Sequence, residues 1–121
     1  MRLVFCLKRK PGMSLEDFQA YWFNNHAPLV KSVAGVLNIA GYVQLHSANA
    51  SAVIGLAGPR ETAVEQYDGV AELTWNTRED FMAAGKTEEG RAAAKMLLED
   101  ERHFIDLPNS PIFLTAERVV V

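Results

Sequence analysis

The order of strand-like and helix-like segments constrains the fold of this chain more than any other feature. Strand-like segments lie at residues 3–7, 38–46, 67–75 and 112–121 of the 121-residue sequence. Helical spacing of apolar residues separates the first from the second, and the third from the fourth. The order β-α-β-β-α-β predicts an α+β, ferredoxin-like fold with two helices on one face of an antiparallel sheet. No linker divides the chain, so we expect one domain over residues 1–121.

The first helix is expected from Leu15 to about Asn25, after the N-cap candidate Ser14. Its apolar face has helical spacing and consists of Leu15, Phe18 and Trp22. His26 is the next member of that face. Pro28 disfavours helical backbone at the residue before it, so the helix should break or kink near His26, with a second helical piece at 29–36.

The second helical region follows the clearest strand. Thr77 is expected to cap a helix that Gly85 interrupts, and a longer helix should run from Glu88 to Glu101 after Thr87. Residues 47–66 show no clear periodicity and contain many alanines, serines and glycines. A stretch of that length is either a binding loop or lid, or a solvated connection without a role.

Strand alternation predicts two different sheet faces. The face that we assign to the helices is uniformly apolar and comprises Leu3, Phe5, Leu7, Ile39, Val43, Leu45, Leu73 and Trp75. The opposite face mixes polar and apolar residues, namely Val4, Cys6, Tyr42, Gln44, His46, Asp68, Val70 and Glu72. Such a face fits the lining of a cavity that a second subunit closes, so we expect a homodimer.

His26 and Glu72 are the candidate catalytic residues. His26 continues a buried helix face at the helix end, and a histidine with a near-neutral pKa suits general acid–base work. The alternative is a core histidine that caps the last carbonyls of the helix. Glu72 lies in the middle of a strand, where a carboxylate needs a partner, a raised pKa or a ligand. Its alternative role is a salt bridge on an exposed sheet face.

Trp22, Tyr42 and Asp68 are the candidate substrate-binding residues. Trp22 and Tyr42 would shape the pocket, although Tyr42 could also be an exposed sheet residue. Asp68 shares the face of Glu72, but it precedes Gly69 and could simply be a turn residue.

Composition and missing motifs exclude several classes of protein. The net charge is −3 and the only basic cluster is Lys8-Arg9-Lys10, which argues against nucleic-acid binding. The single cysteine, Cys6, cannot form an internal disulfide, and we expect it to be buried in a strand. No apolar stretch approaches the roughly 18 residues that a membrane span needs. We expect a cytoplasmic protein without a targeting segment, metal or cofactor, because no phosphate loop, H-E-x-x-H or paired cysteines are present.

Three sequence blocks point to a known family. The first runs from Lys8-Arg9-Lys10-Pro11-Gly12-Met13-Ser14 through Phe18 and Tyr21-Trp22 to His26-Ala27-Pro28-Leu29-Val30. The second is Tyr67-Asp68-Gly69-Val70-Ala71-Glu72-Leu73, followed by Glu79-Asp80-Phe81, and the third runs from Asp100-Glu101 to Phe104-Ile105-Asp106. Together they resemble the EthD family, named for ethyl tert-butyl ether degradation.

The resemblance implies a dimeric α+β barrel, in which two ferredoxin-like sheets face each other and small organic molecules bind between sheet and helices. Enzymes of this superfamily include methylmuconolactone isomerases, polyketide cyclases, dehydratases and cofactor-free monooxygenases. The family's recurrent histidine corresponds to His26, and its strand acid to Glu72.

The sequence and the resemblance together predict a protein that holds a small apolar or aromatic molecule. The chemistry that we expect is isomerisation, cyclisation or dehydration of a small cyclic or aromatic carbonyl compound. His26 would move the proton, and Glu72 would orient His26 or hold a substrate hydroxyl. The alternatives are a cofactor-free monooxygenase and a non-catalytic binding or accessory protein of a degradation pathway.

Overall fold

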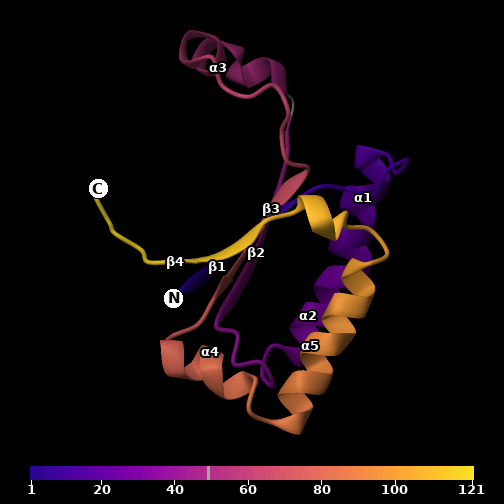
Figure 1. Ribbon diagram of the computed structural model, residues 1–121, viewed down its shortest axis with the longest axis vertical. Coiled ribbons are helices and arrows are strands. Elements are labelled where there is room, and N and C mark those ends of the chain that lie inside the picture. Colours follow the sequence, from indigo (N-terminus) through magenta and orange to yellow (C-terminus); the bar gives the residue numbers. More distant parts are fainter. Residues whose placement is uncertain (49) are drawn as a thin grey trace.

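Four antiparallel strands form one sheet in the computed structural model, which describes residues 1–48 and 50–121. The strands are β1 (Arg2–Leu7), β2 (Gly41–His46), β3 (Gly69–Thr74) and β4 (Ile112–Thr115). Their order across the sheet is β2-β3-β1-β4, so β3 separates β1 from β2, and β1 separates β3 from β4. This is the predicted α+β, ferredoxin-like arrangement (Figure 1).

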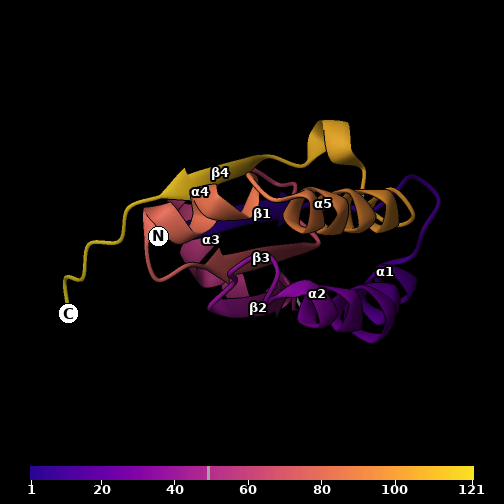
Figure 2. The ribbon, with the colours of Figure 1, turned by 90° about the horizontal axis from the view of Figure 1, so that it is seen from below.

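The helices on the sheet are α1 (Leu15–Tyr21), α2 (Ala27–Val33) and α5 (Glu88–Glu101), with the short α4 (Arg78–Ala84) before α5. Helices α1, α4 and α5 each begin at a hydroxyl cap, because the side chains of Ser14, Thr77 and Thr87 accept backbone hydrogen bonds. Helices α1 and α2 lie over β2 and β3, and α5 lies over β1 and β4 (Figure 2). The boundaries expected for α5 are confirmed.

The expected break near His26 is instead a continuous change in helix type. A π-helical segment, η1 (Trp22–His26), joins α1 to α2, and the Ala27 N–H donates to the Trp22 carbonyl five residues earlier. Pro28 has no N–H to donate, which favours this wider turn over a regular α-helical one. In a regular helix, residues four apart drift by about 40° around the axis. The wide turn cancels that drift and keeps His26 on the face of Trp22.

The β2 strand faces the opposite way from our prediction. Tyr42 pairs with Leu73, and Gln44 pairs with Ala71, so both polar residues share the helix-covered face with these β3 residues. Val43 and Leu45 therefore lie on the uncovered face, where they are half-exposed.

Hydrogen bonds explain why polar residues of β2 lie under the helices. The Trp22 indole N–H donates to the Tyr42 hydroxyl at 3.1 Å, and the Gln44 amide donates to the Trp22 carbonyl at 3.0 Å. The His46 ring stacks on Trp22 with centroids 4.5 Å apart and bonds to Gln44 at 2.9 Å. Buried polar groups are tolerated when they are bonded in this way, and alternation alone does not reveal such partners.

The core lies between the sheet and the helices. Its fully buried side chains come from β1, the first helical region, β3 and the segment after α5, namely Leu7, Phe18, Trp22, Ala71, Phe104 and Ile105. Gly69 is required for this packing, because a Cβ at Gly69 would overlap the Trp22 ring. The largest side chain of the core is thus placed directly on the backbone of β3.

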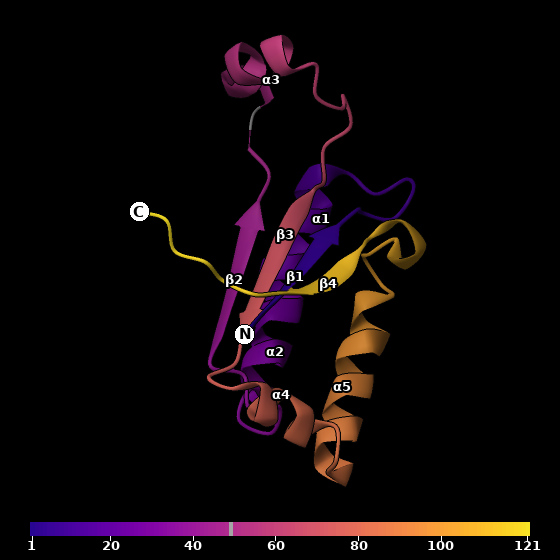
Figure 3. The ribbon, with the colours of Figure 1, turned by 60° about the vertical axis from the view of Figure 1, so that its left-hand side comes forward.

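The opposite face of the sheet is open. Figure 3 views the sheet from this side, with α1, α2 and α5 behind the strands. The open face carries Val4, Cys6, Val43, Leu45, Val70, Glu72 and Phe113, as the strand pairing shows. Cys6 is half-buried there, rather than fully buried as expected.

Two segments extend beyond the sheet. Residues 47–66 contain a short 3₁₀ turn, η2 (Ala50–Val53), and a helix, α3 (Ile54–Arg60), that projects past the ends of β2 and β3 (Figures 1 and 3). The predicted strand at 112–121 ends at Thr115. Thr115 pairs with Arg2, the first residue of β1, so later residues have no neighbouring strand to bond with.

Candidate active site

A small cavity of about 130 Å³ lies between the sheet and the helices. Its walls are mostly apolar and consist of Leu3, Phe5, Leu7, Trp22, His26, Val30, Tyr42, Ala71, Leu73, Leu97, Glu101, Ile105 and Ile112. Engineered apolar cavities of roughly 150 Å³ bind benzene, so this space suits a single ring. Three polar side chains reach it, from His26, Tyr42 and Glu101.

His26 is held by a carboxylate from α5. Its Nδ1 lies 2.7 Å from Oδ2 of Asp100, and the ring is only 5% exposed. The other Asp100 oxygen, Oδ1, accepts a 2.6 Å hydrogen bond from the Tyr21 hydroxyl. A carboxylate can only accept hydrogen bonds, which assigns the imidazole proton to Nδ1. Nε2 is then the basic nitrogen.

Burial determines the charge state of His26. Desolvation lowers the pKa of His26 below its usual 6.5, and the bond to Asp100 offsets part of that effect. The imidazole is therefore neutral at pH 7. The hydrogen bond to Asp100, with a smaller contribution from burial, raises the pKa of Tyr21 to about 12, so the Tyr21 hydroxyl stays protonated and keeps donating to Asp100.

Glu101 lines the same cavity and has an unusual environment. Desolvation, together with the charge of Asp100, raises the pKa of Glu101 to about 7. Among the described residues, no hydrogen bond or ion pair to its carboxyl group is formed. Cavities that combine a neutral histidine with a partly protonated carboxyl group are suited to general acid–base catalysis.

Trp22 and Tyr42, both predicted to shape the pocket, line this cavity. They are linked by the hydrogen bond from the Trp22 indole to the Tyr42 hydroxyl. Burial raises the pKa of Tyr42, so its hydroxyl is neutral and available as a hydrogen-bond donor.

Glu72 lies on the other face of the sheet. It pairs with Val4 and Val43 on the open face, and its carboxylate forms a 3.0 Å ion pair with Arg2. The expectation that His26 and Glu72 border one cavity is therefore wrong within this chain. Strand alternation correctly sends Glu72 away from Leu73, and the wide turn at η1 keeps His26 under the helices.

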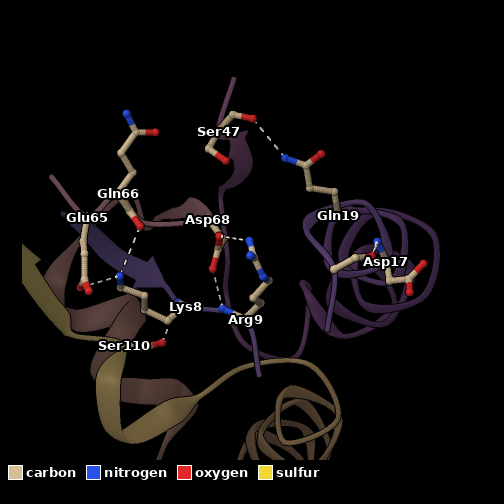
Figure 4. A network of polar contacts seen from close by, with 10 residues as sticks. Lys8, Arg9, Asp17, Gln19, Ser47, Glu65, Gln66, Asp68 and Ser110 are labelled. Carbon is tan, nitrogen blue, oxygen red and sulfur yellow. Dashed lines mark hydrogen bonds and ion pairs between the residues drawn. The ribbon is translucent and has the colours of Figure 1, made fainter. Parts of the chain in front are cut away.

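Asp68 lies at the end of the sheet and not in the cavity. Its carboxylate accepts from the Arg9 guanidinium and from the Arg9 backbone N–H, both at 2.7 Å (Figure 4). The neighbouring Lys8 bonds Glu65 and the Gln66 carbonyl. Asp68 thus ties the end of β1 to the start of β3, and its geometry is that of a structural link.

Sequence reasoning missed Asp100, Glu101 and Tyr21 as site residues. Asp100 lies 74 positions after His26, and nothing in local spacing connects them. One signal was available, because Asp100 and Glu101 open the third sequence block, at the end of α5. Two adjacent carboxylates at a helix C-terminus interact unfavourably with the helix dipole. A functional site at this end of α5 would account for their presence.

Neither a metal-binding cluster nor a membrane-spanning helix is found in the part of the chain that the structure describes. Within residues 1–48 and 50–121, no three histidines, cysteines or carboxylates come close enough to hold a metal ion. None of the helices in this part of the chain has the length and apolar character needed to cross a bilayer.

A ferredoxin-like sheet with a buried histidine–carboxylate pair beneath its helices defines a small α+β protein built around an internal pocket. Residues 10–108 match the family model described as the EthD domain. The chain therefore belongs to the EthD family, as the three sequence blocks suggested.

Two fungal proteins are distantly similar in sequence. The chain is 26% identical over 104 residues to "Decarboxylase claH" of Passalora fulva, a match that covers 84% of this chain and 66% of that protein. It is also 26% identical over 110 residues to a protein named "Decarboxylase" from Claviceps purpurea (strain 20.1), covering 89% of this chain and 76% of that protein. The chain thus spans just under two thirds of the length of the first relative.

Solved structures support the fold. An EthD family protein of Bacillus halodurans C-125 superposes with a TM-score of 0.56 at 16% identity, covering 95% of this chain and 97% of that one. A dimeric protein with a ferredoxin-like fold from Bacteroides fragilis NCTC 9343 gives a TM-score of 0.55 at 10% identity, covering 93% and 90%. At these identities the likeness shows the fold alone.

Proposed function

We propose that the protein is a cofactor-free enzyme that transfers protons at carbon next to a carbonyl group. Its substrate would be a small, largely apolar cyclic or aromatic compound. The observation that carries the proposal is the neutral His26, held by Asp100 at the wall of an apolar cavity. Glu72, which lies on the opposite face, has no part in it.

The proposed reaction begins with His26 Nε2 as the base. It removes the proton from carbon α to the carbonyl, and the bonding electron pair forms an enolate. The Asp100 carboxylate stabilises the imidazolium that results, through the bond to Nδ1. Return of the proton to another carbon gives isomerisation, its transfer to a departing β-hydroxyl gives dehydration, and attack of the enolate on a second carbonyl gives cyclisation. Such a positioned base contributes roughly 10²–10⁴-fold to the rate.

Decarboxylation is the second candidate, because both fungal relatives are named decarboxylases. In a β-keto acid, the bond to the carboxylate breaks, CO₂ leaves, and the electron pair forms the same enolate. A proton must then be supplied to carbon. The Glu101 carboxyl, with its pKa of about 7, is protonated in about half of the molecules at pH 7 and can supply it.

A second copy of the chain is the proposed partner of the open sheet face. Val43, Leu45 and Phe113 are about half-exposed there, which is a large apolar cost for a single chain in water. The similarity to a dimeric protein of ferredoxin-like fold supports a homodimer. In such a dimer, the Arg2–Glu72 ion pair would lie at the subunit interface.

Exchange of α-hydrogens in D₂O tests the proposed chemistry. Cyclohexanone is a single ring that matches the cavity, and NMR follows deuterium entering beside its carbonyl. We expect catalysed exchange, reduced about 10²-fold or more by His26→Gln. Lys31→Gln, at an exposed position of α2, is the control. Release of CO₂ from 2-oxocyclohexanecarboxylate tests the decarboxylase alternative.

The outcomes separate the hypotheses. Exchange that persists at the wild-type level in His26→Gln contradicts the role of His26. If wild-type protein catalyses neither reaction yet binds cyclohexanone, the non-catalytic binding alternative holds instead.

A further inference from the structure

A groove of about 560 Å³ adjoins the cavity and takes no part in the proposed chemistry. It lies between α4, one side of α5, the end of β3 and the segment after α2. Its lining comprises Leu37, Ile39, Leu73, Trp75, Phe81, Met82, Ala84, Gly85, Lys86, Gly90, Arg91, Ala94, Leu97 and Glu101. Leu73, Leu97 and Glu101 also line the cavity, so the groove and the cavity meet at these three residues.

Small residues create the groove. Gly90 lets α5 approach α4 closely, because a Cβ there would overlap the Ala84 carbonyl oxygen. One turn further along α5, Ala94 presents only a methyl group to the groove. The groove therefore results from short side chains along α5.

The side chains that line the groove offer mainly apolar contacts. The Trp75 indole N–H donates to the Leu37 carbonyl at 2.9 Å, so its polar atom is satisfied within the protein. Phe81 packs edge-on against Trp75 with centroids 4.9 Å apart. The charged residues of the lining are Lys86 and Arg91 from the α4–α5 region and Glu101 at the junction with the cavity. Between them the lining is apolar.

We propose that the groove binds an apolar extension of the substrate while the carbonyl-bearing ring occupies the cavity beside His26. The substrate class is therefore an elongated molecule, with a carbonyl ring at one end and a second, uncharged apolar ring or chain at the other. This inference rests on the proposed function, because it uses the same catalytic cavity. It is supported by the three lining residues that the groove and the cavity share, and by the size of the cavity, which suits only one ring.

The two tryptophans of the chain report on the two compartments separately. Trp22 lines the cavity and Trp75 lines the groove, and there is no third tryptophan in the sequence. Labelling with 5-fluorotryptophan gives one ¹⁹F resonance for each, and Trp75→Phe assigns them. Cyclohexanone is expected to shift the Trp22 resonance alone. Its longer analogue 4-phenylcyclohexanone is expected to shift both, and to bind at least tenfold more tightly.

Matched substitutions on α5 test the location. Ala94→Phe fills the groove and is expected to weaken 4-phenylcyclohexanone binding about tenfold more than cyclohexanone binding. Ala92→Phe, at an exposed α5 position outside the groove, is the control. Ala94→Leu provides a smaller filling group if the phenylalanine variant does not fold.

Separate readouts distinguish this inference from the proposed function. Catalysed exchange of cyclohexanone, with a Trp75 resonance that 4-phenylcyclohexanone does not move, overturns the groove proposal and leaves the function intact. Movement of the Trp75 resonance without any catalysed exchange overturns the function and leaves groove binding. Equal binding of 4-phenylcyclohexanone to Ala94→Phe and wild type also overturns the groove proposal.

Discussion

The two faces of the sheet treat polar and apolar side chains in opposite ways. Under the helices, Tyr42 and Gln44 of β2 are partly buried, with hydrogen-bond partners on Trp22. On the open face, Val43 and Leu45 of the same strand are about half-exposed. The hydrophobic pattern of a strand is thus a guide to its orientation only when both sides and all polar partners are known.

Glu72 and Glu101 show the same difference between the two faces of the sheet. Glu72 on the open face is neutralised by Arg2, whereas Glu101 under the helices has no partner among the described residues and a pKa raised to about 7. A carboxylate with an ion pair is explained by that pair. A partly buried carboxylate without an ion pair, beside a cavity, is the better candidate for chemistry.

The largest expected difference between the faces is in packing energy. Leu7, under the helices, is 1% exposed, and Leu45, on the open face, is 47% exposed. Leu7→Ala is expected to lower the free energy of unfolding by about 2–5 kcal/mol. Leu45→Ala should cost under about 1 kcal/mol at low protein concentration, because little area is buried in one chain. Urea denaturation measures both, and equal losses would contradict the difference between the faces.

The two glutamates should differ in how they affect stability with pH. The pKa of Glu101 rises from 4.5 unfolded to about 7 folded, so the folded chain binds the proton more tightly. The free energy of unfolding should therefore fall as the pH rises from about 4.5 to 7. The expected loss is about 2 kcal/mol, after allowance for the partial exposure of Glu101. Glu101→Gln is expected to remove this slope, whereas Glu72→Gln should keep it.

Neighbouring groups must be considered in that measurement. Asp100 adds to the raised pKa of Glu101 and remains present in the variant. His26 has a lowered pKa, so its contribution acts in the opposite sense, reducing stability as the pH falls below 6.5. Burial raises the pKa of Tyr42, which also lines the cavity, so its hydroxyl stays protonated between pH 4.5 and 7. The difference between wild type and Glu101→Gln isolates Glu101, and identical pH profiles would contradict its raised pKa.

Association through the open face gives the next prediction. A charge at Val43, introduced as Val43→Lys, should weaken the homodimer at least tenfold, because a desolvated ammonium would have to enter an apolar interface. Light scattering at micromolar concentration is expected to give twice the mass of one chain for wild type and a lower value for the variant. The mass of a single chain for wild type would rule out the dimer.

The smallest expected effect is on the reactivity of Cys6. Burial raises the pKa of this half-buried thiol on the open face, which keeps it in the less reactive protonated form. Labelling with a thiol reagent should therefore be slow in the native protein, and a few-fold faster in Val43→Lys, where a partner no longer covers the face. Rapid labelling of wild type would argue against cover by a second copy.

Local sequence patterns predicted most of the fold and part of the site. The strands β1 and β3 alternate cleanly, and α5 is bounded by Thr87 and by the end of its helical pattern, so these elements follow from neighbouring residues. His26 follows from helical spacing with Phe18 and Trp22. The orientation of β2 depends on contacts with Trp22, and the role of Asp100 depends on its contact with His26. These partners lie far apart in the chain, so local spacing of residues does not predict the contacts.

The wide turn at Trp22–His26 makes room for one residue more than a regular α-helical turn holds. Deleting one residue here, such as Asn24, would return the segment to regular α-helical hydrogen bonding. The residues after the turn would keep nearly the same rotation about the helix axis, because five residues of the wide turn cover about the same angle as four residues of an α-helix. An alignment gap of one residue within this turn is therefore compatible with a histidine that still meets Asp100, and relatives should be aligned on that histidine rather than on its distance from Trp22.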